Sequence, residues 1–219
     1  MFRENLEQVE SRIHNAAHRA GRRREDITLV AVSKVFPAAA IREAWACGVR
    51  DFGENYVQEI ESKLPDLHDL GGARFHLIGH LQSNKSRRAA EIFHVIQTVD
   101  SGKLARRLNE YGKPIQVMVE VNLSGEASKS GVPPDEVQAL CGAVQSCPNL
   151  VLLGLMTMPP WFDDPEDARP YFRRLGGLAA RLELPCLSMG MSSDFEVAIE
   201  EGATHIRIGT ALFGKRRRQ

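Results

Sequence analysis

Short apolar runs alternate with amphipathic stretches along almost the whole chain. The first run, residues 28–34, is a series of apolar, β-prone side chains that ends at a serine and a lysine. Such a run is typical of a strand buried on both faces. Similar runs follow at residues 50–53, 74–79, 94–99, 115–122, 151–157, 186–190 and 205–209. Helical periodicity marks the stretches between them: residues 37–47, 55–64, 101–111, 133–146, 164–182 and 193–201, with a shorter, more polar candidate after His80.

The chain opens with an amphipathic helix, expected within residues 1–22. Leu6, Val9, Ile13 and Ala17 fall at helical spacing, and Gly21 ends the pattern. Start signals for the later helices are Pro37, Asp100-Ser101, Pro133-Pro134, Asp163-Asp164-Pro165 and Ser192-Ser193-Asp194. End signals are Gly48, Gly112 and Gly202.

Eight strands that alternate with helices indicate parallel β/α units and, by their number, a closed barrel. We therefore predict an α/β protein with a single-domain TIM-type (β/α)8 barrel over residues 1–219. The main alternative is an open doubly wound sheet, which usually has a Gly-rich first turn, and residues 32–35 lack one. The chain shows no repeat, low-complexity segment or linker-like stretch, so we expect one domain that ends in a basic tail at residues 215–219.

Composition narrows the function classes. Lys plus Arg number 28 and Asp plus Glu number 28, so no net charge favours nucleic acid or a membrane surface. We interpret the basic tail as a solvated terminus rather than a nucleic-acid arm. The four cysteines are scattered without metal-ligand spacing, as expected for small core residues of a reducing compartment. The sequence shows neither a secretory signal nor a membrane-spanning segment, which predicts a soluble, cytoplasmic protein.

Lys34 lies at the carboxyl end of the first buried run, where a lysine either reaches for water or meets a ligand. Burial lowers the pKa of a lysine ammonium, and only the neutral amine attacks a carbonyl. Aldehydes that form Schiff bases, pyridoxal 5′-phosphate (PLP) above all, require this kind of lysine. The alternative is a side chain that simply extends along the strand end into solvent.

The last two strand ends have the character of an anion site. Gly190 is followed by Met191, Ser192 and Ser193, and the eighth run ends in Gly209-Thr210. Backbone N–H groups at such positions favour a phosphate, which these barrels usually bind after strands seven and eight. The alternative is that the serines cap a helix and that Gly209 forms a plain turn.

Arg207 shares side-chain parity with His205 and Gly209 in the last run. If this face lines the barrel, the guanidinium is a buried cation that needs a partner. A pyridine ring is one such partner: Arg has only donors and would hold an unprotonated ring nitrogen, which weakens the cofactor's electron sink and suits carriage better than broad catalysis. With the opposite parity, Arg207 would pair with a carboxylate on a helix.

Three further features carry weaker signals. Asn55 would lie beside Lys34 in the barrel order, where it contacts the hydroxyl of a cofactor ring or caps a helix. His80 carries protons at the barrel mouth or lies in a surface loop. Four methionines near the mouth are explained more simply by core packing than by contact with a ring. They are Met156, Met158, Met189 and Met191.

Several segments together resemble one known family. They are VAVSK (30–34), FGENYVQE (52–59), FHLIGHLQSNK (75–85), VNLSGEASKSG (121–131), GLMTM (154–158), SMGMSSDFEVAI (188–199) and IRIGTALFG (206–214). This pattern covers nearly the whole chain and resembles the PLP homeostasis protein family, the PLP-binding proteins of YggS/PROSC type. No position expected to carry chemistry departs from it.

The resemblance implies a barrel like the N-terminal domain of alanine racemase, with PLP on Lys34 as an internal aldimine. It also implies that Arg207 faces the pyridine nitrogen and that Asn55 contacts the ring. The phosphate would lie against the loops that contain Met191, Ser192, Gly209 and Thr210.

Members of this family are associated with control of the PLP pool and with amino- and keto-acid balance, without robust enzymatic activity. The resemblance therefore implies a PLP carrier, reservoir or regulator. We expect a monomer, and apo-PLP enzymes are candidate recipients of the cofactor.

Two other functions stay open at this point. A fold-type III PLP enzyme, such as an amino-acid racemase, needs a second base on the opposite face of the cofactor, which related racemases draw from an additional β-domain and a partner subunit. We expect no such domain, because the chain ends about five residues after Phe213-Gly214. A phosphosugar-binding barrel explains the anion site but leaves Lys34 and Arg207 unexplained.

Overall fold

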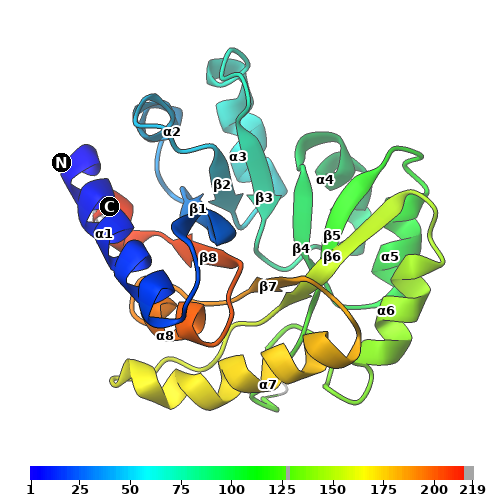
Figure 1. The fold of residues 1–219 in the computed structure, drawn as a ribbon. Helices are drawn as coiled ribbons and strands as arrows, with labels where there is room; N and C mark the ends of the chain where they lie inside the picture. Colours follow the sequence, from blue (N-terminus) through cyan, green and yellow to red (C-terminus); the bar gives the residue numbers. More distant parts are fainter. Residues whose placement is uncertain (127–128, 215–219) are drawn as a thin grey trace.

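The computed structural model describes residues 1–126 and 129–214. In these ranges eight parallel strands follow one another around a closed barrel, and β8 pairs with β1 to complete it (Figure 1). The strands are β1 Thr28–Val32, β2 Asp51–Glu54, β3 Arg74–Leu77, β4 Val95–Val99, β5 Ile115–Glu120, β6 Leu150–Met156, β7 Cys186–Ser188 and β8 His205–Ile208.

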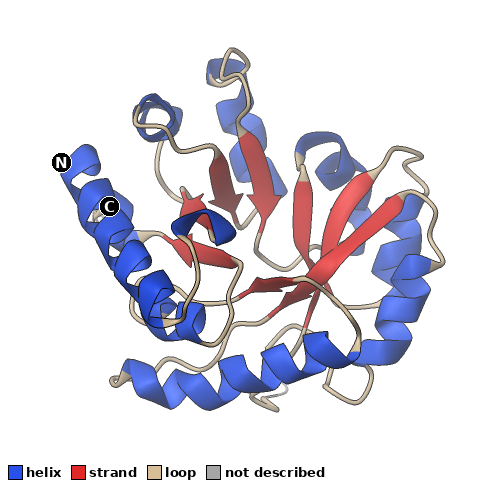
Figure 2. Cartoon of the chain, in the orientation of Figure 1, coloured by secondary structure: helices blue, strands red, loops and turns tan. Residues whose placement is uncertain are grey.

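Helices surround the strands on the outside of the barrel (Figure 2). The α-helices are α1 Phe2–Arg19, α2 Ala38–Ala46, α3 Val57–Lys63, α4 Ser86–Ile92, α5 Gly102–Asn109, α6 Val137–Gln145, α7 Arg169–Arg181, α8 Phe195–Glu200 and α9 Thr210–Phe213. Short 3-10 helices lie at Arg24–Asp26, Leu64–Asp66, Ser83–Lys85 and Pro165–Ala168.

The predicted (β/α)8 barrel is confirmed, and the open doubly wound sheet is wrong because β1 pairs with both β2 and β8. Each of the eight expected runs overlaps a strand, although β2 ends one residue later and β6 begins one residue earlier than expected. Several strands end before the apolar run does: β1 ends at Val32 and β7 at Ser188, since the chain turns away from the ladder at that point. The residues expected to carry chemistry therefore lie just beyond the strands, in the loops.

Most helix signals are confirmed, and the differences concern the starts of α6 and α8 and the presence of α9. Ser101 caps α5, where its hydroxyl accepts a hydrogen bond from the Leu104 amide at 3.3 Å. Helix α6 begins at Val137, later than the Pro133-Pro134 signal, and the polar stretch after His80 does form a helix, α4. The expected helix at 193–201 begins only at Phe195, and α9 was not expected at all.

Helix α1 ties the start of the chain to its end. Its apolar side, with Val9 and Ile13 buried, packs against α8 and α9. The Asn5 side-chain amide donates to the Leu212 carbonyl at 2.8 Å, and Arg12 pairs with Glu196 at 2.6 Å. The opening helix predicted within residues 1–22 is thus part of the barrel's outer layer, beside the strand pair that closes the sheet.

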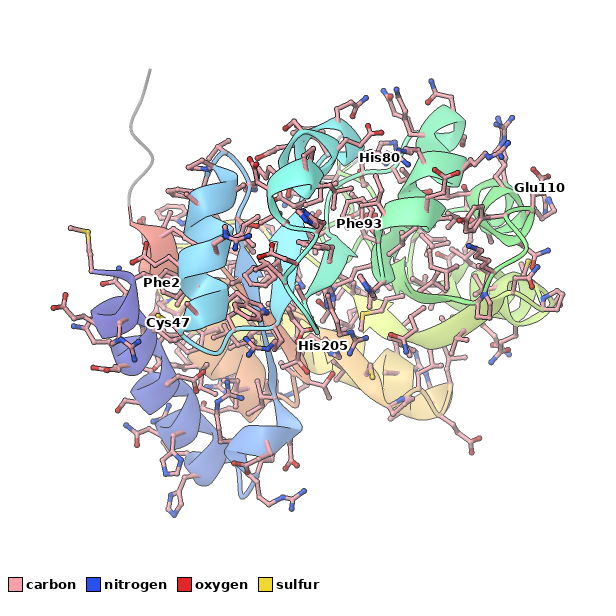
Figure 3. The ribbon with its side chains drawn as sticks, turned by 90° about the horizontal axis from the view of Figure 1, so that it is seen from above. Phe2, Cys47, His80, Phe93, Glu110 and His205 are labelled. Atoms are coloured by element: carbon pink, nitrogen blue, oxygen red, sulfur yellow. The ribbon has the colours of Figure 1, made fainter. Side chains whose placement is uncertain are left out.

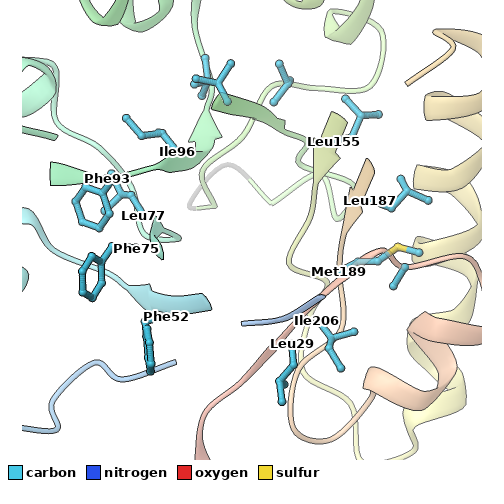
Figure 4. Close-up of a cluster of buried hydrophobic side chains, with 14 of the residues drawn as sticks. Leu29, Phe52, Phe75, Leu77, Phe93, Ile96, Leu155, Leu187, Met189 and Ile206 are labelled. Atoms are coloured by element: carbon cyan, nitrogen blue, oxygen red, sulfur yellow. The ribbon is translucent and has the colours of Figure 1, made fainter. Parts of the chain in front are cut away.

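The main hydrophobic core lies between the outer faces of the strands and the helices (Figure 4). Phe52 and Phe75 are register partners on β2 and β3, and their rings pack 6.0 Å apart. The next pair in register is Gly53 and His76, which face the barrel interior instead, because neighbouring residues of a strand point to opposite faces. The interior is therefore where polar side chains of the strands can meet.

The helices and the cysteines of the described ranges bear on two of the expectations from the sequence. In the described ranges, no helix is long and apolar enough to cross a membrane. All four cysteines fall in those ranges and are free: Cys141 and Cys147 are buried, while Cys47 and Cys186 are partly buried. The basic tail at residues 215–219 lies outside the described residues.

Candidate functional site

The residues singled out from the sequence gather at one end of the barrel. Because all strands run parallel, the segments that follow them emerge at the same rim. Lys34 follows β1, Asn55 follows β2, Met191 and Ser192 follow β7, and Gly209 follows β8. Strands β7, β8 and β1 are consecutive in the closed sheet, so three of these segments are direct neighbours. This rim is the candidate site.

Lys34 is partly buried and follows Ser33, which is fully buried. A second lysine, Lys63 of α3, anchors this strand end: its ammonium donates to the Ser33 carbonyl at 3.1 Å and to a Glu54 carboxylate oxygen at 2.8 Å. The Ser33 hydroxyl donates to the same Glu54 oxygen at 2.7 Å. Burial raises the pKa of Glu54, and the bonds from Lys63 and Ser33 oppose that rise. This cluster fixes the backbone from which Lys34 projects.

Sequence reasoning missed Lys63 and Glu54. The available signal was the placement of Lys63 four residues after Glu59, a spacing at which side chains of a helix meet. The two are indeed paired at 2.8 Å. Their spacing is common on exposed helix faces, however, and only the fold shows that Lys63 is turned inward with 7% of its surface exposed.

The backbone turns sharply directly after Lys34. Val35 has φ of 64°, a left-handed conformation that a β-branched residue rarely adopts, and its side chain is exposed. Strain of this kind costs on the order of 1–3 kcal/mol and persists where the surroundings hold it. Here the Val35 amide donates to the carboxylate of Glu59, which also binds Lys63. The turn after Lys34 and the anchor before it therefore share one carboxylate.

The loops after β7 and β8 are joined. The Ser192 hydroxyl accepts a hydrogen bond from the Ala211 amide at 3.3 Å. Gly190 has φ of 91°, and a Cβ there would lie 2.6 Å from the Cβ of Ala198, so only glycine fits. Among the described residues, no loop or turn hydrogen bond uses the backbone N–H groups of Ser192, Ser193 or Gly209 as donors. These groups are available to an anionic ligand.

The capping alternative is wrong for α8, whereas the Ser192 hydroxyl does accept from the Ala211 amide in the first turn of α9. Helix α8 is capped by Asp194, and one oxygen of its carboxylate accepts from the Met191 amide at 2.6 Å. Burial raises the pKa of Asp194, an effect opposed by that hydrogen bond and by the charge of Arg207. Thr210, at the first position of α9, is exposed at the same rim.

Arg207 points into the barrel, as its parity with His205 predicts for an interior face. It is 3% exposed and donates to the Ser188 hydroxyl at 2.6 Å and to the Thr157 carbonyl at 2.9 Å. Burial lowers the pKa of Arg207 to about 10, while the charges of Asp194 and Glu120 oppose the shift. The outward alternative, with a helix carboxylate as partner, is therefore wrong.

Asn55 lines a cavity of about 300 Å³ together with Tyr56, Gly79, His80 and other residues of this rim. It is not the cap of α3, a position that Tyr56 holds. A Cβ on Gly79 would lie 2.4 Å from the Asn55 carbonyl oxygen, so the loops after β2 and β3 are in close contact. His80 is half-exposed and faces Asp100 at 3.3 Å, well apart from His205 at the start of β8 (Figure 3).

A second cavity, of about 340 Å³, lies at the same rim and is lined by Glu120, Met158, Met191 and neighbouring residues. The methionine cluster is therefore split, since Met156 and Met189 are fully buried. Glu120 is 2% exposed, and its Oε2 has no hydrogen-bond partner among the residues that the structure describes. Burial and the nearby charge of Asp100 raise the pKa of Glu120 to about 7.

Replacement of Glu120 by glutamine is expected to flatten the pH dependence of stability. Because the pKa of Glu120 is raised from 4.5 to about 7, the folded state binds this proton more tightly than the unfolded chain does. The resulting stabilisation is present below about pH 4.5 and is lost as the pH rises through 7, which amounts to roughly 3 kcal/mol. Urea unfolding at pH 5 and pH 8 measures it. Glu126→Gln, at an exposed carboxylate, is the control, and equal slopes in Glu120→Gln and wild type would contradict the prediction.

The rim fits a ligand such as PLP better than a metal ion. In the described part of the chain, no group of three or more His, Cys, Asp or Glu side chains is placed to hold a metal. A lysine at the end of β1, a buried guanidinium on β8 and available N–H groups after β7 and β8 match an aldehyde, a ring nitrogen and a phosphate, respectively.

Comparison with known proteins gives a consistent result. The family description "Alanine racemase, N-terminal domain" matches residues 5–217. A protein of Pseudomonas aeruginosa named pyridoxal phosphate homeostasis protein is 50% identical, covering 97% of this chain and 95% of that protein. Proteins of the same name from Aquifex aeolicus and Escherichia coli are 44% and 46% identical, each over at least 95% of both chains.

Solved structures show the same relationship. PipY of Synechococcus elongatus, solved with PLP bound, superimposes with a TM-score of 0.86 at 38% identity, covering 98% of this chain and all of that one. Alanine racemase from Corynebacterium glutamicum superimposes with a TM-score of 0.69 at 22% identity over 62% of its own length. The latter likeness is one of fold alone.

Proposed function

Because the chain belongs to the pyridoxal phosphate homeostasis protein family, we infer that it binds PLP and acts in PLP homeostasis. The observation that carries the assignment of a site is the placement of three complementary groups on consecutive strands. Lys34 follows β1, Arg207 lies on β8, and Ser192 follows β7.

We propose these roles for the residues of the rim. Lys34 would hold PLP through its amine, and the bound cofactor would supply the aldehyde with which that amine can form a Schiff base. Arg207, fixed by Ser188 and the Thr157 carbonyl, donates to the ring nitrogen. Asn55, which lines the cavity of about 300 Å³, contacts the PLP ring. The phosphate is held by the joined loops with Met191, Ser192, Gly209 and Thr210.

Replacement of Gly209 by leucine is expected to weaken the binding of PLP far more than that of pyridoxal, which lacks the phosphate. A Cβ at Gly209 would lie 3.5 Å from the Cβ of Val32, an ordinary contact, so the fold tolerates a side chain there. A longer side chain would hinder the approach of a phosphate. We expect the PLP dissociation constant to rise at least about tenfold and that of pyridoxal less than about threefold. Gly209→Ala is the control, and equal losses for both ligands would place the anion site elsewhere.

The proposed role is that of a carrier or reservoir without robust catalysis. A guanidinium has only donors, so it keeps the ring nitrogen unprotonated and limits the stabilisation of a carbanion. The racemase alternative requires a second base on the opposite face of the cofactor. Incubation of the PLP-loaded protein with L- and D-alanine in deuterated water separates the two.

We expect negligible α-proton exchange in that experiment, and recovery of activity when the loaded protein is mixed with an apo-PLP enzyme. Nuclear magnetic resonance of alanine follows the exchange, and the activity of the recipient enzyme follows the transfer. Exchange with racemisation at roughly one turnover per second or faster would identify an enzyme instead.

A further inference from the structure

A continuous chain of buried polar side chains crosses the interior of the barrel. It runs from Arg207 on β8 through Ser188 on β7, Gln97 on β4 and His76 on β3 to Asp51 on β2. The successive contacts are 2.6 Å, 2.6 Å, 2.9 Å and 2.8 Å long. The first four residues are at most 3% exposed, and the Asp51 side chain is 17% exposed.

The chain depends on the closed sheet. Ser188 and Gln97 lie on β7 and β4, which are not neighbours in the strand order, so their side chains meet only across the interior. Asp51 begins β2, whereas Arg207 lies near the carboxyl end of β8. The chain therefore connects the proposed site at the rim to the opposite end of the barrel.

Donor and acceptor chemistry gives the chain one direction. A guanidinium only donates, so the Ser188 oxygen accepts from Arg207 and its single proton goes to the Gln97 carbonyl. The Gln97 amide nitrogen then donates to His76 Nδ1. That nitrogen must be an acceptor, which leaves the ring proton on Nε2, facing Asp51. Every proton points from the cation toward the anion.

Opposite charges at the two ends favour this direction. Aligned hydrogen bonds in a low-dielectric interior strengthen one another, and reversal of one would oppose all the others. Burial raises the pKa of Asp51, whereas the hydrogen bond from His76 Nε2 and the neighbouring charge of Arg74 lower it, and this pKa lies below its ordinary value. Asp51 therefore stays an acceptor at neutral pH.

We propose that Gln97 and His76 are positioning residues that fix the orientation of Arg207 toward its ligand from the far end of the barrel. If the ligand is PLP, as proposed above, its ring nitrogen accepts a hydrogen bond from the Arg207 guanidinium. That guanidinium cannot rotate, because one of its nitrogens donates to Ser188 and another donates to the Thr157 carbonyl. Gln97 and His76 act through Ser188 without contacting the ligand.

Two substitutions of Gln97 test this role, because a structural role and a positioning role predict opposite rankings of the two variants. Gln97→Met keeps the volume but breaks the chain on both sides. Gln97→Glu still accepts from Ser188, and it draws a proton onto His76 Nδ1, so the hold on Arg207 survives. A buried carboxylate is costlier to the fold than a thioether. If Gln97 has only a structural role, Gln97→Met should bind the ligand more tightly than Gln97→Glu. If Gln97 positions Arg207, Gln97→Glu should bind the ligand more tightly than Gln97→Met.

The first readout needs no ligand. Nitrogen-15 and carbon-13 spectra of the unliganded protein should show His76 protonated on Nε2 and separate, slowly exchanging guanidinium signals for Arg207. In Gln97→Met, the Arg207 guanidinium signals should merge, and His76 should show both ring tautomers. In Gln97→Glu, the separate Arg207 signals should be preserved. Gln116→Met, on the neighbouring strand β5, is the matched control. It breaks a bond to Arg74, which lies 3.9 Å from Asp51, but leaves all four hydrogen bonds of the chain in place.

The second readout is the dissociation constant of PLP. We expect Gln97→Met to raise it at least about tenfold, and Gln97→Glu and Gln116→Met less than about threefold. If Gln97→Met does not fold, Ser188→Ala breaks the chain with the loss of one hydroxyl and should act alike. Unchanged Arg207 signals and PLP affinity in the broken-chain variant would overturn the proposal. Failure of the wild type to bind PLP would instead contradict the proposed function and leave the spectra of the unliganded protein to decide.

Discussion

Replacement of Lys34 by alanine is expected to abolish the borohydride-stable attachment of PLP while the barrel stays folded. Borohydride converts a Schiff base into a stable secondary amine, so peptide mapping by mass spectrometry identifies the attached lysine. Because only non-covalent contacts would remain, the affinity for PLP should fall at least about tenfold, or about 1.4 kcal/mol. Lys34 lies beyond the last residue of β1 and is only partly buried, so its truncation should affect stability little.

The matched control for this experiment is Lys85→Ala. Lys85 lines the cavity beside Asn55 and His80, so it is another lysine of the same rim. It should keep the adduct at the level of the wild type. An adduct that persists in Lys34→Ala, or disappears in Lys85→Ala, would assign the Schiff base to another amine.

Replacement of Gly154 by alanine is expected to have the largest effect on stability. Gly154 on β6 is the register partner of Cys186 on β7, and a Cβ there would lie 1.8 Å from the Cys186 carbonyl oxygen. Backbone cannot yield that much without breaking the contact between the two strands. We expect a loss of at least about 3 kcal/mol in the free energy of unfolding, or a failure to fold. Urea unfolding followed by circular dichroism measures it.

Gly177→Ala provides the comparison. Gly177 lies on the exposed side of α7, and a Cβ there would have nothing within 4 Å. Because alanine loses less conformational freedom than glycine in a helix, this variant should gain about 0.5–1 kcal/mol. Similar effects of the two substitutions would mean that β6 and β7 are not in this close register.

The strand pair around Gly154 also carries the two partners of Arg207. Strands β6 and β7 carry Thr157 and Ser188, at or just beyond their ends, and these are the two partners of Arg207. The close packing at Gly154 thus also sets the distance between the groups that hold the guanidinium. Partial destabilisation of this strand pair should weaken ligand binding before the barrel unfolds.

The fold, and the rim at which the candidate residues gather, could be predicted from the amino-acid sequence. Eight apolar runs between amphipathic stretches predicted eight parallel strands, and all eight are present. Strand direction then placed Lys34, Asn55, Ser192 and Gly209 at one rim, because residues that follow parallel strands emerge together. Parity in β8 grouped Arg207 with His205 and Gly209 on one face but left open whether that face points inward. Each of these features depends on local periodicity, which the sequence carries directly.

The pairs of side chains that meet could be identified only in the folded protein. Gln97 and Ser188 are 91 residues apart and touch because the sheet closes. The spacing of Lys63 and Glu59 is that of an ordinary ion pair on a helix surface, whereas in the folded protein Lys63 also pairs with the buried Glu54. Nothing in the sequence distinguishes Glu120 from other strand residues, whereas in the folded protein its carboxylate is buried beside a cavity. Periodicity specifies the face on which a side chain lies, whereas its partner depends on the curvature and closure of the whole barrel, to which every strand contributes.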